Sequence, residues 1–80
     1  MRKSHELLLK FRFDPRYSFS QVQVWYVDRG APGDHSCVDG DHIRTLDSYY
    51  MEIGTELETK CIPYHRIRKI LYGGKVVWER

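Results

Sequence analysis

The chain has 80 residues, of which 41% are hydrophobic, 14% aromatic and 30% charged. This length is typical of one small domain with a thin core, and the apolar content is too high for a disordered chain. No run of about 18 apolar residues is present to cross a membrane, and Lys10 interrupts the leucines at 7–9, which excludes a signal-peptide core. We therefore expect a single cytoplasmic domain over residues 1–80 that does not enter a membrane.

The net charge of +2 conceals an uneven distribution along the chain. Residues 1–27 carry five basic and two acidic side chains (+3), and residues 28–58 carry two basic and eight acidic ones (−6). Residues 59–80 carry six basic and one acidic side chain (+5). If the two basic ends meet in the fold, they form a patch that attracts phosphate groups. The alternative is an ordinary mixed, solvated surface, and the sequence leaves both open.

The first predicted element is a helix over residues 4–12. Ser4 is a suitable N-cap, and the spacing of Leu8 and Phe11 places both on one face. Pro15 ends the helix, because proline disfavours helical geometry in the residue before it.

A strand is predicted over residues 21–27, where valine and tyrosine alternate with polar or aromatic neighbours. The glycines and proline within residues 28–34 then break this strand. Residues 35–40, which follow, are predicted as a loop.

Further strands are predicted toward the C-terminus. Asp47 and Ser48 are suitable turn residues, and the pair at 73–74 favours a two-residue hairpin turn, because glycine adopts positive φ at little cost. These strands cover residues 42–46, 49–53, 57–62, 66–72 and 75–78.

The predicted elements add up to an α+β fold. It consists of the N-terminal helix and about five mostly antiparallel strands, which form a bent sheet or a small barrel. Tyr26 and Trp78 are expected in its core.

The segment at residues 62–67, Ile-Pro-Tyr-His-Arg-Ile, is the first candidate site. Its proline fixes the backbone just before the polar residues, and the two isoleucines are expected to point inward. His65 and Arg66 would then sit on a rigid element. Arginine offers a planar fork of donors to phosphate, and histidine can donate to phosphate or act as an acid or base. The alternative is a strand entry with a structural histidine and a solvated arginine.

A second candidate is the loop at residues 28–33, which contains Arg29, Gly30 and Gly33. A loop of small residues at a strand end exposes backbone N–H groups that bind anions, and Arg29 would add positive charge. It is not a Walker loop, because it lacks the Gly-Lys-Ser/Thr ending. The alternative interpretation is a plain turn.

Aromatic side chains could stack on RNA bases, although most are expected in the core. Tyr64 is the preferred stacking candidate because it lies beside His65. The candidates are Tyr17, Phe19, Trp25, Tyr49, Tyr50, Tyr64, Tyr72 and Trp78.

Metal and catalytic patterns are weak. The histidines and cysteines do not match a standard zinc spacing, so we expect no metal and no cofactor. Acid–base chemistry has one candidate, His65 with Asp28 or Asp41, and no nucleophile elbow or paired-histidine motif accompanies it. The metal ligands considered are His35, Cys37, His42, Cys61 and His65.

Taken together, several segments resemble a known family. They are Tyr-Val-Asp-Arg-Gly-Ala-Pro-Gly at 26–33, Asp-His-Ile at 41–43, the run at 62–70 that contains Pro-Tyr-His-Arg-Ile, and Gly-Lys-Val-Val-Trp at 74–78. Their order and spacing are similar to those of a small, largely archaeal family of uncharacterised proteins, described as the RNA cyclic-group end recognition domain. The resemblance spans nearly the whole chain, and the Pro-Tyr-His-Arg-Ile segment is its most specific part.

The resemblance implies a stand-alone version of a domain that elsewhere is fused to RNA-processing domains. Its implied role is the recognition of RNA ends that carry a 2′,3′-cyclic phosphate, in RNA processing or repair, with RNA-processing proteins as further partners. Arg29, His65 and Arg66 would contact the terminal phosphate. The full set of implied RNA-binding residues is Arg29, Gly30, Gly33, Tyr64, His65, Arg66 and Arg68.

Two other functions stay open at this stage. One is a small RNA-end-processing phosphoesterase that uses His65 as an acid or base. The other is a protein-interaction module that binds no RNA. Binding is favoured over catalysis, because a single histidine does not show that two catalytic groups converge.

Overall fold

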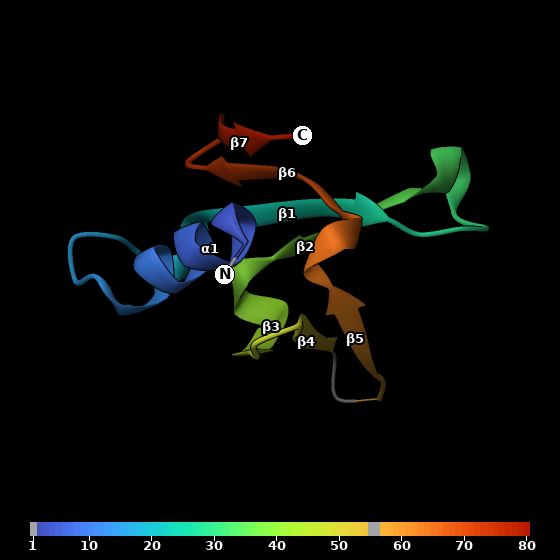
Figure 1. Ribbon diagram of the computed structural model, residues 1–80, viewed down its shortest axis with the longest axis horizontal. Coiled ribbons are helices and arrows are strands. Elements are labelled where there is room, and N and C mark those ends of the chain that lie inside the picture. The colour runs from blue at the N-terminus through green and yellow to red at the C-terminus, as the bar shows by residue number, and fades with distance from the viewer. Residues whose placement is uncertain (1, 55–56) are drawn as a thin grey trace.

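A computed structural model describes residues 2–54 and 57–80, and over these residues one α-helix is followed by seven strands (Figure 1). The elements are α1 (Lys3–Phe13), β1 (Val22–Val27), β2 (His35–Asp39), β3 (Ile43–Leu46), β4 (Tyr50–Gly54), β5 (Thr59–Pro63), β6 (Ile67–Tyr72) and β7 (Lys75–Glu79). Short 3-10 turns precede or join the strands, and they are η1 (Phe19–Gln21), η2 (Pro32–Asp34), η3 (Gly40–His42) and η4 (Tyr64–Arg66).

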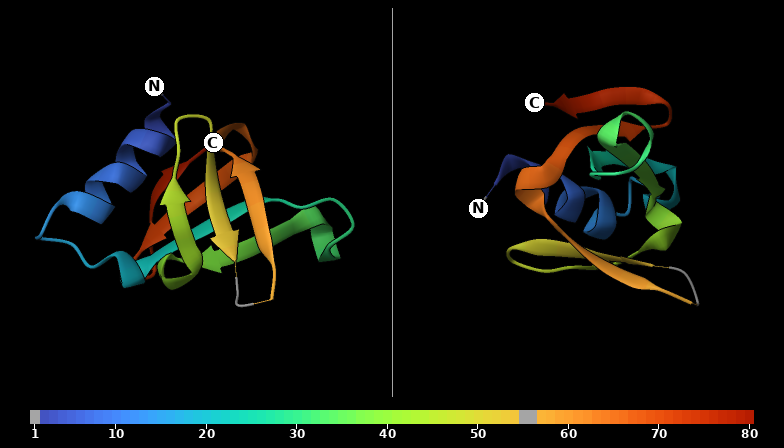
Figure 2. Two further views of the ribbon diagram at one scale, coloured as in Figure 1. Left: turned by 90° about the horizontal axis from the view of Figure 1, so that it is seen from below. Right: turned by 90° about the vertical axis from the view of Figure 1, so that its right-hand side faces the viewer.

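The strands form two sheets that face each other. One has the order β2-β1-β6-β7 and the other β3-β4-β5. Figure 2 shows the smaller sheet across from the larger one, with α1 along one side of the space between them. Along the central strands β1 and β4, buried residues alternate with less buried ones, so each of these strands buries one face.

The predicted α+β class and the antiparallel pairing are confirmed, but the arrangement of the strands differs from the expectation. The described strands make two separate sheets and no closed barrel. Residues 35–40, predicted as a loop, contain β2, which pairs with β1 through the neighbours Trp25↔Cys37 and Val24↔Val38. Only Val38 of β2 is buried, so this edge strand lacks the apolar alternation from which strands are predicted.

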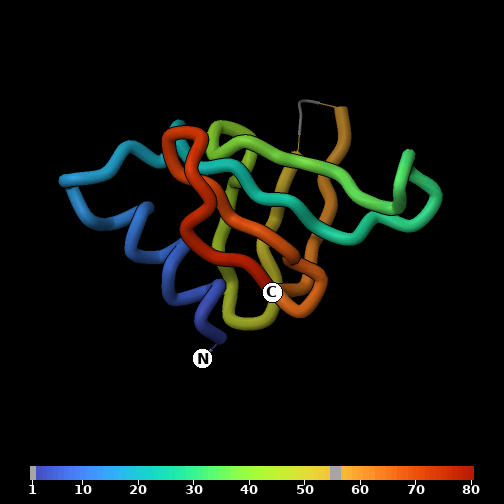
Figure 3. The backbone as a smooth tube through the Cα atoms, turned by 90° about the horizontal axis from the view of Figure 1, so that it is seen from above, coloured from blue at the N-terminus to red at the C-terminus, as the bar shows by residue number. Residues whose placement is uncertain are grey.

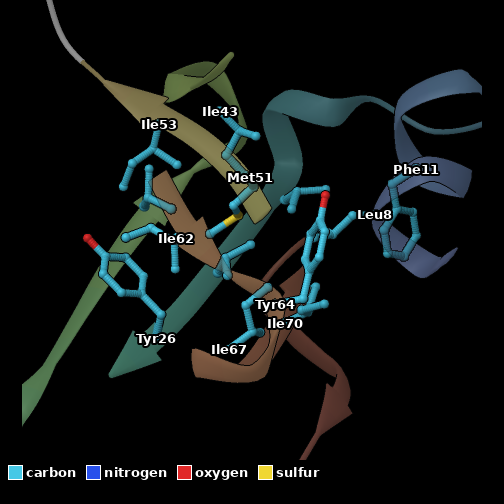
Figure 4. Close-up of a cluster of buried hydrophobic side chains, with 13 residues drawn as sticks. Leu8, Phe11, Tyr26, Ile43, Met51, Ile53, Ile62, Tyr64, Ile67 and Ile70 are labelled. Atoms are coloured by element: carbon cyan, nitrogen blue, oxygen red, sulfur yellow. The ribbon is translucent and has the colours of Figure 1, made fainter. Parts of the chain in front are cut away.

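The hydrophobic core fills the space between the sheets and α1 (Figure 4). The core prediction is confirmed for Tyr26, which is 5% exposed. It holds only in part for Trp78, which is partly buried and packs against the core from β7, at the edge of its sheet. The buried hydrophobic residues are Leu8, Phe11, Val22, Val24, Tyr26, Val38, Ile43, Met51, Ile53, Ile62, Tyr64, Ile67 and Ile70.

The helix α1 ends as predicted but begins differently. Asp14 closes it, with its N–H bonded to the Lys10 carbonyl at 2.9 Å. Arg2 occupies the N-cap position without a side-chain hydrogen bond, and Ser4 lies inside the first turn. Ser4 is therefore not the N-cap, because its side chain is turned into the core and is 1% exposed.

Glycine serves a different purpose at each of two turns in the described chain. The hairpin between β6 and β7 turns at Gly73 and Gly74, whose φ values of 58° and 85° confirm the predicted turn. At Gly40 the requirement is steric, because a Cβ there would lie 1.8 Å from the carbonyl oxygen of Phe19. This close approach joins η3 to η1, and no local sequence pattern predicts it.

His5 is a buried polar side chain in the first turn of α1. Its ring is 5% exposed and stacks on the ring of Tyr64, with centroids 4.4 Å apart and planes 17° apart. Among the described residues, neither ring nitrogen of His5 has a hydrogen-bond partner. A buried polar atom without a partner costs roughly 1–3 kcal/mol. His5 therefore contributes packing at the expense of unsatisfied polar atoms.

We expect the substitution His5→Phe to raise the free energy of unfolding by about 1–3 kcal/mol, because it keeps an aromatic ring against Tyr64 and removes both unsatisfied nitrogens. Urea denaturation would measure the change, and the dependence of the free energy of unfolding on urea concentration should stay the same. His65→Phe, at an exposed position, serves as the control and should change stability by less than about 0.5 kcal/mol. A less stable His5→Phe variant would show that the histidine nitrogens have a partner in solution.

Candidate functional site

The turn η4 connects the two sheets and is anchored on both sides. It follows β5 and precedes β6, and the flanking Ile62 and Ile67 are buried as predicted, at 5% and 0% exposure. Pro63 is the last residue of β5 and pairs with Tyr50, which the edge position of this strand permits. His65 and Arg66 are both exposed. The structure thus presents these two side chains to solvent from a short, fixed turn.

Tyr64 is the first residue of η4 and has a structural role. It is 1% exposed, its ring stacks on His5, and its hydroxyl donates a hydrogen bond of 2.6 Å to the carbonyl of Asp47. Burial raises the pKa of Tyr64 to about 12. In this structure the ring of Tyr64 is packed inside the protein and offers no free face on which an RNA base could stack.

His65 lines a cavity of about 580 Å³, which we call the η4 cavity. Arg2, from the start of α1, reaches the same cavity, as does Tyr49 from the turn between β3 and β4. Tyr49 is 84% exposed, so its ring is accessible to a ligand. None of the described lining residues is acidic; they are Arg2, Ser48, Tyr49, Tyr50, Pro63, Tyr64 and His65.

The C-terminal residue adds a further positive charge beside this turn. The guanidinium of Arg80 donates a hydrogen bond of 2.7 Å to the carbonyl of His65, and its backbone N–H donates to the carbonyl of Arg68 at 2.9 Å. Figure 3 shows both ends of the chain on the side of the molecule where η4 lies. Arg2 and Arg80 therefore bring the two basic ends of the chain to one turn, a question that the sequence left open.

The second predicted segment, the loop after β1, lies at the same end of the larger sheet. Tyr26 near the end of β1 pairs with Ile67 at the start of β6, immediately after η4. Arg29 in this loop is exposed, as is Arg68 in β6. The fold thus brings the two predicted segments to one end of a sheet.

The backbone of this loop binds its own carboxylate. Gly30 and Gly33 have positive φ, at 95° and 68°, as an anion-binding loop requires. However, the N–H of Gly30 donates to the Asp34 side chain at 3.2 Å, and Asp28 accepts a hydrogen bond of 2.6 Å from Ser36. In this conformation the Gly30 amide is therefore occupied by a carboxylate, which would repel a second anion.

Comparison with known proteins bears on what this turn does. The family described as the MJ1316 RNA cyclic group end recognition domain matches residues 1–80. The chain belongs to this family. The predicted resemblance is thereby confirmed.

Archaeal UPF0248 proteins are similar to this chain over most of both lengths. That of Archaeoglobus fulgidus is 39% identical over 71 residues, which cover 89% of this chain and 96% of the relative. That of Thermococcus gammatolerans is 39% identical over 83 residues, which cover 100% of this chain and 94% of the relative. That of Pyrococcus abyssi is 38% identical over 82 residues, which cover 99% of this chain and 93% of the relative. No solved structure matches the chain.

Sequence reasoning did not single out three residues of the site. Arg2, Tyr49 and Arg80 lie far from η4 along the chain, and no local pattern links them to His65. Only the uneven distribution of charge pointed to the two ends. Tyr49 was one of eight aromatic candidates and had no feature that set it apart.

The described residues offer little support for metal or acid–base chemistry. No group of three or more His, Cys, Asp or Glu side chains in this part of the chain is arranged to hold a metal ion. The carboxylate of Asp28 accepts a hydrogen bond from Ser36 of β2, and no described lining residue of the η4 cavity supplies a carboxylate to His65. In residues 2–54 and 57–80, no helix is long and apolar enough to cross a membrane.

We expect the free energy of unfolding to fall as the pH rises from about 10 to about 12. The phenol of an unfolded tyrosine ionises near pH 10, whereas burial holds the pKa of Tyr64 at about 12. Ionisation therefore favours the unfolded state in this window, and the stabilisation that is complete below pH ~10 is lost as the pH passes through ~12.

Urea denaturation of Tyr64→Phe at about pH 9 and about pH 11 measures this effect, because phenylalanine cannot ionise. The fall in stability should be smaller in Tyr64→Phe than in the parent protein. Tyr49→Phe, at an exposed position, should leave the fall unchanged. Equal falls in the parent and Tyr64→Phe would contradict the assignment to Tyr64.

Proposed function

We propose that this protein binds the 3′ end of a single-stranded RNA that carries a 2′,3′-cyclic phosphate, and that the η4 cavity holds this end. One observation supports this proposal above all: His65, from the most specific segment of the family resemblance, shares a cavity with Arg2 and the exposed Tyr49. None of the described residues that line this cavity is acidic. The family description names RNA cyclic group end recognition, which agrees with this choice of ligand.

The chemistry of the cavity suits a phosphate on a ribose. Arg2 supplies a planar guanidinium for the phosphate oxygens, and the imidazole of His65 supplies a second donor. The volume of about 580 Å³ lies within the range of small-ligand sites, so the cavity can admit the sugar together with its phosphate. The lack of acidic side chains among the described lining residues avoids repulsion of the anion.

Tyr49 is the residue to which we assign base stacking, in place of Tyr64. Its ring is 84% exposed and stands at the cavity that would hold the terminal phosphate. Stacking on an aromatic ring suits single-stranded RNA, because every base offers a flat face. The terminal base would lie on Tyr49 while its phosphate lies between Arg2 and His65.

The remaining predicted residues are assigned to the RNA backbone upstream of the end. Arg29, Arg66 and Arg68 are exposed near the same end of the larger sheet. Such arginines attract phosphates without reading the sequence. Gly30 and Gly33 shape the loop that carries Arg29, and they are not assigned a contact of their own.

We expect an RNA that ends in a 2′,3′-cyclic phosphate to bind more tightly than the same RNA with a 3′-hydroxyl. Arg2→Ala and His65→Ala should each weaken binding of the cyclic end by roughly 10- to 100-fold, as is usual for hydrogen bonds to charged groups. Fluorescence anisotropy with both RNAs would measure the affinities. Binding should weaken as the salt concentration rises. The logarithm of the binding constant should fall with the logarithm of the salt concentration, with a slope of about −0.7 for each contacted phosphate.

Arg16→Ala is the matched control, because it also removes one arginine. Arg16 pairs with Asp14 in the connector after α1 and does not line the η4 cavity. Its loss should change affinity only slightly. Equal affinity for the two RNA ends, or an effect of Arg16→Ala as large as that of Arg2→Ala, would show that the protein responds to charge alone.

A further inference from the structure

A second cavity, of about 300 Å³, lies between the two sheets, and we call it the inter-sheet cavity. Its floor is made by Tyr26, Val38 and Ile53, all of which are nearly buried. Figure 4 shows Tyr26 at the margin of the core cluster, with its hydroxyl directed away from the other labelled side chains. The cavity thus opens from an apolar and partly aromatic floor toward solvent.

The rim of the inter-sheet cavity carries both hydrogen-bond donors and acceptors. Lys60 and His42 can donate, and the carboxylates of Asp39 and Glu58 accept. All four residues are exposed, so their polar ends are available to a ligand. Among the described lining residues two carboxylates face one lysine, so this cavity is not matched to phosphate, unlike the η4 cavity.

The form and chemistry of the inter-sheet cavity match an unpaired nucleobase. A base is flat, uncharged and aromatic, and its edge presents donors and acceptors side by side. Its faces would contact the apolar floor, and its edge would meet the polar rim. The volume of about 300 Å³ is at the lower end for ligand sites, which suits one base and excludes a longer stretch of chain.

The hairpin of β4 and β5 connects the two cavities. At one end Tyr50 and Pro63 are paired and both line the η4 cavity. At the other end Ile53 and Lys60 are paired and both line the inter-sheet cavity. Three residue steps separate the ends, or about 10 Å along the strand at ~3.3 Å per residue. Because side chains alternate between the two faces of a strand, the two pairs point to opposite faces of the smaller sheet, and an RNA strand that reaches both cavities crosses the open edge of β5. An RNA strand can cover such a distance within a few nucleotides.

The path between the cavities follows an open strand. β5 is an edge strand of the smaller sheet, and Figure 2 shows it at that edge, leading into η4. Its residues Thr59, Lys60 and Cys61 are exposed. A strand of RNA along this edge would meet a lysine and no acidic residue of β5.

We propose that the inter-sheet cavity binds one unpaired nucleobase of the same RNA strand whose phosphate end lies in the η4 cavity. This inference rests on the proposed function and extends it from a terminal group to a short single-stranded 3′ segment. The protein then selects RNA ends with a few unpaired nucleotides, and the base upstream of the end provides part of the affinity.

The test is a set of RNAs ending in a 2′,3′-cyclic phosphate, in which each nucleotide in turn is replaced by an abasic one. For the parent protein, one upstream position should show a loss of affinity of roughly 5- to 100-fold, the range for loss of a bound base. In the variants His42→Ala and Lys60→Gln, the loss at that position should shrink, because the base is no longer held there. His35→Ala and Lys75→Gln, outside both cavities, are the matched controls.

The outcomes separate this inference from the proposed function. If no upstream position is sensitive, or if the sensitivity survives in the His42 and Lys60 variants, the inter-sheet site is overturned while a preference for the cyclic end still stands. If the cyclic end is not preferred and His65→Ala has no effect, the proposed function fails. In that case, or if the protein binds none of these RNAs, the inference falls with it. Circular dichroism spectra equal to that of the parent protein establish that each variant is folded.

Discussion

The burial of Tyr64 is the constraint on which the rest of the structure depends. Its ring stacks on His5 of α1, its hydroxyl bonds the carbonyl of Asp47, and its N–H bonds the carbonyl of Tyr49 at 3.3 Å. One side chain in the turn between the sheets thereby fixes the helix and the turn before β4 together. Because a thin core has few such contacts, this residue determines which surface η4 presents.

The same packing assembles a cationic site from distant parts of the chain. Tyr64 points inward, so the next residue, His65, points to solvent, and the helix that packs on Tyr64 brings Arg2 to the same cavity. Arg80 bonds to the turn from the opposite end of the chain. The acidic middle of the chain contributes instead to the inter-sheet cavity, through Asp39 and Glu58. The two cavities therefore differ in charge because the carboxylates of one come from the middle of the chain, whereas the middle residues that line the other, at 48–50, are uncharged.

Local patterns predicted the elements that have strong local signals. Alternation of apolar residues marked β1, and paired glycines marked the turn between β6 and β7. The edge strand β2 was missed because it buries only Val38, and the capping role of Ser4 was wrong because tertiary packing turned that side chain inward. Both errors arise where a residue's environment is set by contacts with distant segments.

The sequence by itself determined the α+β class, the family and the short segment that carries His65 and Arg66, since these depend on local periodicity and on a contiguous motif. Only the tertiary structure decided that Tyr64 is a core residue and that the Gly30 amide binds Asp34. It also decided that Arg2 and Tyr49 join His65 in one cavity. The physical reason is that burial and charge at a site depend on which distant surfaces pack together, and that information is spread over the whole chain.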